Sequence, residues 1–260
     1  MRAAALLVLL LAGPALAQDE AALRREVGGQ LLRLAARRTT PAAEHALVDV
    51  ELERDGAPFD RARKVEVSVR AREGSTALRL RFREPAALRD EAWLVIADAG
   101  EEVRAWRYVP AKRRAERASP PEPTWRVGGS GLLWRDLWPG AGPADGVLVR
   151  DDALRPDGSF AGTAAVGSEA RAVHVVQLAQ GPLLAIDRER HVPLLVLERD
   201  DQGGVLRRLV QADWRWVGGA LRPFSLRVTE PRDGQVTRVA VAWRRPEPPP
   251  AHFDPDRFWE

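Results

Sequence analysis

The sequence predicts a mainly β protein built on a single large curved antiparallel sheet, with a few helices covering the concave face. Two observations carry this prediction. After one N-terminal helical segment, apolar residues recur at every second position, and the runs are separated by turn-forming residues. Strict alternation is typical of antiparallel strands with one buried and one solvated face. A sheet of this many strands must curl or close.

The N-terminus has the pattern of a secretory signal peptide. Arg2 supplies a positive charge, residues 3–12 are apolar, Gly13 and Pro14 break the run, and residues 15–17 (Ala-Leu-Ala) form a small-x-small cleavage site. The apolar run is shorter than the roughly 20 residues that span a bilayer. We therefore expect residues 1–17 to be removed and residues 18–260 to form a single periplasmic domain.

Residues 19–38 have helical periodicity, because Leu23, Val27, Leu31 and Leu34 recur at spacings of three and four. Pro41 should end this helix. The period then changes to two, and the expected strands are 47–50, 64–70, 78–83, 91–98, 102–110, 171–179, 192–200, 205–217, 221–229 and 235–244. Residues 73–75 and 233–235 should be hairpin turns.

Other segments predict irregular structure. Residues 119–123 (Ser-Pro-Pro-Glu-Pro) exclude a regular element. Residues 85–90 and 130–138 favour short helical or loop insertions, and 139–168, rich in Gly, Pro and Asp, favours a long excursion. The pairs Asp151-Asp152 and Asp200-Asp201 lie in turn-like contexts.

Composition excludes several kinds of site. The chain has no cysteine, which excludes disulfides, thiolate metal sites, a cysteine nucleophile and a lipid-modified N-terminal cysteine. The four histidines have no metal-ligand spacing, and no phosphate-binding loop occurs. Ser130 lacks the glycine that a nucleophile elbow needs two positions later, where Leu132 stands. Acids interleave with bases, unlike a nucleic-acid protein. We therefore expect no enzyme, cofactor, metal or nucleic-acid partner.

The nine tryptophans are the most informative side chains. Their positions are consistent both with ordinary core packing and with the lining of a hydrophobic cavity, and periodicity does not distinguish the two. From the strand faces we take as cavity candidates Trp93, Trp106, Tyr108, Trp134, Leu137, Trp214, Trp216, Phe224 and Trp243. Two interpretations also stay open for Arg79, Arg81 and Arg83: a solvated outer face, or a face toward anionic lipid headgroups.

Over about residues 45–260 the chain resembles a known family. Residues 80–89 (LRFREPAALR), 106–117 (WRYVPAKRRAER) and 129–137 (GSGLLWRDL) are similar to consecutive motifs of the outer-membrane lipoprotein-sorting (LolA-like) proteins. The C-terminal half continues the likeness at 192–194, 201–204, 217–223, 234–237 and 253–258. Gly131 and Gly218 depart from the family pattern, where acidic residues stand.

The resemblance implies an open half-barrel closed by helices, with a hydrophobic cavity that holds acyl chains. It implies a periplasmic carrier that holds a lipid, or the acyl chains of a lipoprotein, for transfer toward the outer membrane. Its partners would be an inner-membrane transporter and an outer-membrane acceptor, and we expect a monomer. The alternative is a lipid-sensing or partner-docking module on the same scaffold, without a transport role.

Overall fold

A computed structural model describes residues 5–72, 74–98, 102–137, 145–165, 170–179, 181–244 and 248–260, with only the backbone for 5–18 and 164. Two α-helices occur in these ranges, α1 (Ala5–Thr39) and α2 (Trp134–Leu137). The strands are β1 (Ala43–Arg54), β2 (Ala57–Pro58), β3 (Arg63–Arg72), β4 (Ser75–Glu84), β5 (Ala92–Asp98), β6 (Arg104–Val109), β7 (Arg114–Ala118), β8 (Gly146–Leu154), β9 (Arg171–Leu178), β10 (Leu183–Asp187), β11 (Pro193–Arg199), β12 (Val205–Val217), β13 (Ala220–Glu230) and β14 (Gln235–Arg244). Short 3-10 turns are η1 (Pro110–Lys112), η2 (Val127–Gly129), η3 (Thr163–Ala165) and η4 (Pro250–Phe253).

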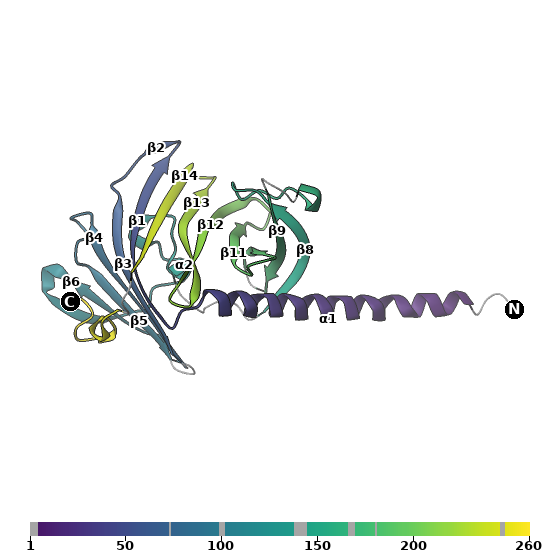
Figure 1. Ribbon diagram of the computed structural model, residues 1–260, viewed down its shortest axis with the longest axis horizontal. Coiled ribbons are helices and arrows are strands. Elements are labelled where there is room, and N and C mark those ends of the chain that lie inside the picture. Colours follow the sequence, from purple (N-terminus) through teal and green to yellow (C-terminus); the bar gives the residue numbers. More distant parts are fainter. Residues whose placement is uncertain are drawn as a thin grey trace.

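The 14 strands of the described ranges form one antiparallel sheet in the order β7-β6-β5-β4-β3-β1-β14-β13-β12-β11-β10-β9-β8, with β2 beside β1. The sheet is not closed, because β7 and β8 stand at opposite ends of that order. Nearly every strand pairs with its neighbour in sequence, whereas β1 pairs with β14 and so joins the two halves of the chain. The sheet curls around a concave face (Figure 1). The predicted curved antiparallel sheet is confirmed.

Every expected strand is present, and four further strands occur. Of these, β8 lies inside residues 139–168, where we expected a loop excursion, and it contains Asp151 and Asp152, which we expected in a turn. Its sequence, GVLVRDDAL, does not alternate, so periodicity did not reveal it. The expected turn at Asp200 is confirmed, since its carboxylate accepts bonds from the backbone N–H groups of Gln202 and Gly204.

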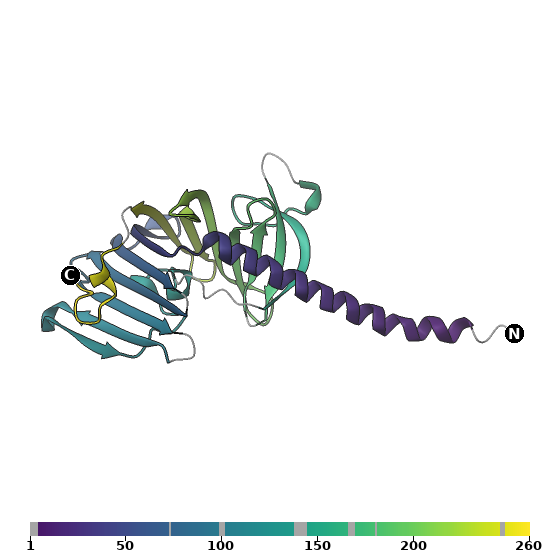
Figure 2. The ribbon, with the colours of Figure 1, turned by 60° about the horizontal axis from the view of Figure 1, so that its bottom comes forward.

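Helix α1 runs along the concave side of the β8–β13 part and then projects away from the sheet (Figures 1 and 2). Leu31 and Leu32 are buried against Val176 and Ile186. A side chain on Gly28 would collide with the backbone of Gly146, so this glycine allows α1 to approach β8 closely. The helix ends two residues before Pro41, as predicted.

The sheet buries apolar side chains on both faces. The largest cluster lies on the concave face and includes Val48, Val67 and Val241. On the opposite face, residues 248–260 lie across β3–β6 and bury Phe258 completely (Figure 2). No helix in the described ranges is long and apolar enough to cross a membrane.

The segment 248–260 changes the environment of the arginines on β4. Arg79 is 0% exposed, and its Nε donates a hydrogen bond to the backbone oxygen of Phe258. Arg81 binds Asp90 and the backbone oxygen of Glu260, and Arg83 binds Glu66. Neither sequence interpretation holds for Arg79, because the chain's own C-terminal segment covers this face.

Candidate functional site: a cavity between the sheet and helix α1

A cavity of about 440 Å³ lies on the concave face, between the sheet and the last turns of α1. Its walls come from α1, β1, β3, β9–β14 and α2. A volume of this size is typical of a small-molecule pocket. The apolar lining residues include Leu32, Ala35, Ala36, Ala46, Val48, Val67, Leu137, Leu178, Leu184, Ile186, Val196, Leu209, Trp214, Leu226, Val241 and Trp243.

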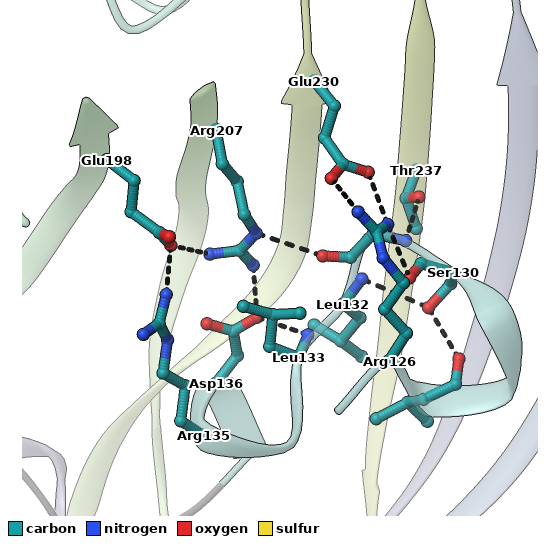
Figure 3. Close-up of polar contacts among 12 residues, drawn as sticks. Arg126, Ser130, Leu132, Leu133, Arg135, Asp136, Glu198, Arg207, Glu230 and Thr237 are labelled. Atoms are coloured by element: carbon teal, nitrogen blue, oxygen red, sulfur yellow. Dashed lines mark hydrogen bonds and ion pairs between the residues drawn. The ribbon is translucent and has the colours of Figure 1, made fainter. Parts of the chain in front are cut away.

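The wall at α2 is held by a network of ion pairs (Figure 3). Arg207 of β12 is buried and binds the carboxylates of Asp136 and Glu198, and its Nε donates to the backbone oxygen of Gly131 at 3.1 Å. Arg126 forms a two-bond pair with Glu230 of β13. These bonds attach α2 and the segment before it to the sheet, so we expect this wall of the cavity to be rigid.

Ser130 belongs to the same segment and has a structural role. It is fully buried, its hydroxyl donates to the backbone oxygen of Val127 at 2.7 Å, and it accepts from the backbone N–H of Leu132. Because the hydroxyl is engaged within its own turn, Ser130 holds the loop in shape. Among the described residues, no group of three or more His, Cys, Asp or Glu side chains is placed to hold a metal ion.

A buried ion pair joins the end of α1 to the sheet at the cavity. Arg222 of β13 donates from Nη2 to Oε1 of Glu44 at 2.7 Å and from Nη1 to the backbone oxygen of Thr39 at 2.6 Å. Its guanidinium carbon lies 4.6 Å from the centre of the Trp243 ring. Arg222 thereby satisfies a carbonyl at the C-terminus of α1 and fixes that end of the helix over the cavity.

The environment of Glu44 opposes its ionisation. Burial raises the pKa of this carboxyl to about 7, although the charge of Arg222 and its hydrogen bond lower it. One carboxylate oxygen, Oε2, is buried without a hydrogen-bond partner in the described part of the chain. An ionised carboxylate in such a place carries a desolvation cost that a single arginine only partly offsets.

Gln211 of β12 is the other polar group of interest in the lining. Its side chain has no hydrogen-bond partner among the described residues, and its neighbours in the lining include Leu209 and Leu226. A primary amide can both donate and accept. The charged groups of the lining are instead paired within the protein, as Glu44 with Arg222 and Asp136 with Arg207.

The structure separates the residues that the sequence suggested as cavity candidates. Leu137, Trp214 and Trp243 line the cavity. Trp134 and Trp93 instead pack on Trp125, with ring centres 6.0 and 5.8 Å apart, in the concave core.

The remaining candidates lie elsewhere. Trp106 and Tyr108 pack under the C-terminal segment, where Tyr108 stacks on Trp259 at 5.1 Å. Phe224 lies beneath the guanidinium of Arg215, and Trp216 is 59% exposed.

Sequence reasoning missed Glu44, Arg222, Gln211 and the lining residues of α1. The sequence did contain a signal for Gln211. It is an uncharged polar residue two positions after the apolar Leu209, so the two side chains share one face of the strand. No local signal marked Glu44 and Arg222, since their pairing joins segments separated by 178 positions.

The comparisons with known proteins agree on the fold. No family model and no curated protein matches the sequence. A solved DUF1329 family protein from Desulfovibrio piger superposes with a TM-score of 0.68 at 16% identity, over 89% of this chain and 97% of that one.

Two further solved structures superpose as well. A putative outer membrane lipoprotein-sorting protein domain from Vibrio parahaemolyticus gives 0.66 at 18% identity, over 88% and 97% of the two chains. A LolA superfamily protein from Nitrosomonas europaea gives 0.59 at 15% identity, over 86% and 96%. The chain therefore has the open half-barrel fold of LolA-like lipoprotein-sorting domains.

Proposed function

We propose that this protein is a non-enzymatic periplasmic carrier that holds a lipid, or the acyl chains of a lipoprotein, in the cavity between the sheet and α1. The observation that carries the proposal is the cavity itself, which is apolar over most of its wall and has its charges paired internally. The fold shared with lipoprotein-sorting domains supports the same function. Transfer from an inner-membrane transporter to an outer-membrane acceptor is the corresponding prediction for partners.

The energetics suit a carrier. Burial of an acyl chain contributes about 0.8 kcal/mol per CH₂, so roughly fourteen carbons contribute about 11 kcal/mol before the entropy of ordering the chain is subtracted. Release then requires the cavity to open. Helix α1 is the wall suited to move, because Arg222 anchors only its C-terminal end and its other contacts with the sheet are mainly with β8 and β13, whereas α2 is held by several ion pairs.

The N-terminus is part of the proposal. Residues 1–4 lie outside the described residues, and residues 5–17 form the start of α1. Cleavage after Ala17 would leave residues 18–39 as the helix that covers the cavity. N-terminal sequencing of the protein recovered from a bacterial periplasm should begin at Gln18, and an intact Met1 would contradict export by cleavage.

The experiment that tests the carrier is mass spectrometry of lipids that co-purify with residues 18–260 from a bacterial periplasm. We expect a stoichiometric lipid or acylated peptide. Ala36→Trp fills the cavity from α1 and should abolish retention, whereas Ala22→Trp, on an exposed turn of the same helix, should preserve it. A protein that purifies empty and fails to bind added lipid would instead favour a partner-docking module.

A further inference from the structure

An exposed patch with an unusual composition borders the cavity. Trp216 is 59% exposed, more than any other large apolar side chain in the described ranges, and Leu34 is 40% exposed. Exposed arginines at positions 33, 37 and 38 flank Leu34 on α1, and Arg38 also lies over the Trp216 ring. We call Arg33, Leu34, Arg37, Arg38 and Trp216 the mouth patch.

The mouth patch adjoins the cavity through both of its elements. On α1, Ala35, Ala36 and Thr39 line the cavity from the same two turns that carry the arginines. On β12, Trp214 lines the cavity two residues before Trp216. The two elements meet, because the guanidinium of Arg38 lies 6.0 Å from the Trp216 ring.

The mouth patch carries an uncompensated positive charge. No hydrogen bond or ion pair joins any described residue to the side chain of Arg33, Arg37 or Arg38. Many other arginines of the described ranges are paired with a carboxylate. The nearest acid in sequence to Trp216 is Asp213, and it is already bound to Arg215 by two hydrogen bonds. Arg38 therefore lies beside the exposed indole without an acidic partner among the described residues, and Arg33 and Arg37 add two further such charges on the same exposed stretch of α1.

We propose that the mouth patch docks the protein on an anionic lipid bilayer with the cavity entrance facing the headgroups. Guanidinium groups bind phosphate with two parallel hydrogen bonds, and tryptophan is enriched at the headgroup level of membranes. Leu34 adds apolar contact one turn from Arg37 and Arg38. This inference deepens the proposed carrier function, because docking in this orientation lets an acyl chain pass between bilayer and cavity without crossing water.

The test is co-sedimentation of residues 18–260 with vesicles of phosphatidylcholine alone and of phosphatidylcholine mixed with phosphatidylglycerol. We expect association only with the anionic vesicles, weakened by added salt. Arg37→Glu with Arg38→Glu should reduce association by roughly thirtyfold or more. Trp216→Ser alone should reduce it by about tenfold, since interfacial burial of the indole is lost.

The matched control is Arg113→Glu with Arg117→Glu, which changes the net charge equally at the β7 end of the sheet. The side chains of these two arginines are also exposed and form no hydrogen bond or ion pair with a described residue. The control should bind within about twofold of the unmodified protein, because its charges lie far from the patch. Equal losses in both pairs, or no loss at Arg37 and Arg38, would overturn the proposal.

A second measurement separates docking from carrying. Binding of a fluorescent monoacyl lipid in vesicle-free solution should be unchanged in the Arg37→Glu, Arg38→Glu variant, since neither residue lines the cavity. Lipid binding without vesicle association would overturn docking and leave the carrier intact. If the protein associates with vesicles through the mouth patch but binds no monoacyl lipid, docking is supported and the proposed carrier function is contradicted.

Discussion

At the scale of single residues, Glu44 is the group whose ionisation most directly affects the cavity. It lies in the lining with one carboxylate oxygen unpaired, and its partner Arg222 holds the last carbonyl of α1. Protonation of Glu44 weakens its attraction to Arg222 but removes the larger desolvation cost of the buried charge. The ionisation of a single carboxyl is thus coupled to the stability of the wall that must open.

We expect Glu44 to make the protein more stable in acid than at neutral pH. Its pKa is about 7 in the folded protein against 4.5 for a free side chain, so the folded state holds this proton more tightly. The resulting stability is full below pH 4.5 and is lost as pH rises through about 7, by up to about 3 kcal/mol.

Chemical denaturation at a series of pH values checks this expectation. The unfolding free energy of the unmodified protein should fall across that window, and the fall should be smaller in Glu44→Gln, which has no proton to lose. Equal pH profiles in the two proteins would show that Glu44 titrates normally.

Gln211 is the residue we expect to distinguish among acyl ligands. Gln211→Leu should weaken binding of an acyl ester or amide by about fivefold, the effect of one lost hydrogen bond, while binding of a plain hydrocarbon chain should improve. Gln202→Leu, in the exposed β11–β12 turn, serves as the control. Titration with the two probe types measures the difference, and a parallel change in both affinities would exclude a polar contact from Gln211.

At the scale of elements, the contact between α1 and β8 depends on a glycine. A helical Gly→Ala change ordinarily stabilises by about 1 kcal/mol. At Gly28 the added carbon would collide with the backbone of Gly146 and Leu148, which cannot withdraw as a flexible side chain could. Helix α1 would have to shift away from the sheet.

We therefore expect Gly28→Ala to destabilise the protein, contrary to helix propensity, and to speed hydrogen exchange of α1. Gln30→Ala, an exposed change on the same helix, should be nearly neutral. Hydrogen exchange with mass spectrometry resolves α1 from the sheet. Unchanged or slower exchange in Gly28→Ala would mean that the contact with β8 is loose.

At the scale of the whole molecule, one sheet presents two faces with different roles. The concave face carries the cavity, and the opposite face is covered by residues 248–260. We propose that residues 18–260 act as one unit, because a single strand ladder runs from β7 to β8 and the C-terminal segment returns to the strands of the first half.

This arrangement predicts that stability and binding can be changed separately. Phe258→Ala should cost about 3–5 kcal/mol of unfolding free energy, because the ring is completely buried. Affinity for an acyl probe should stay within about twofold, since the cavity lies on the other face. Phe59→Ala, at a ring that is 38% exposed, should change neither property much. A large loss of acyl affinity in folded Phe258→Ala would show that the faces are coupled.

The local pattern of the sequence was sufficient to predict most of the architecture. Alternation is a property of neighbouring residues, so runs such as Val65, Val67 and Val69 identified their strands and the antiparallel class together. The helix over 19–38 and its end before Pro41 followed from equally local rules. Strands without alternation, such as β8 and β10, were not predicted, because their burial comes from α1 and from neighbouring strands.

Only the tertiary structure decided which side chains meet. Trp214 and Trp216 share a strand face by spacing, yet Trp214 lines the cavity and Trp216 is exposed beside Arg38 of α1. Arg79 alternates like a surface residue and is buried by a segment 179 positions away. Strand periodicity specifies a face, whereas curvature of the sheet and the return of distant segments determine whether that face meets solvent, core or cavity.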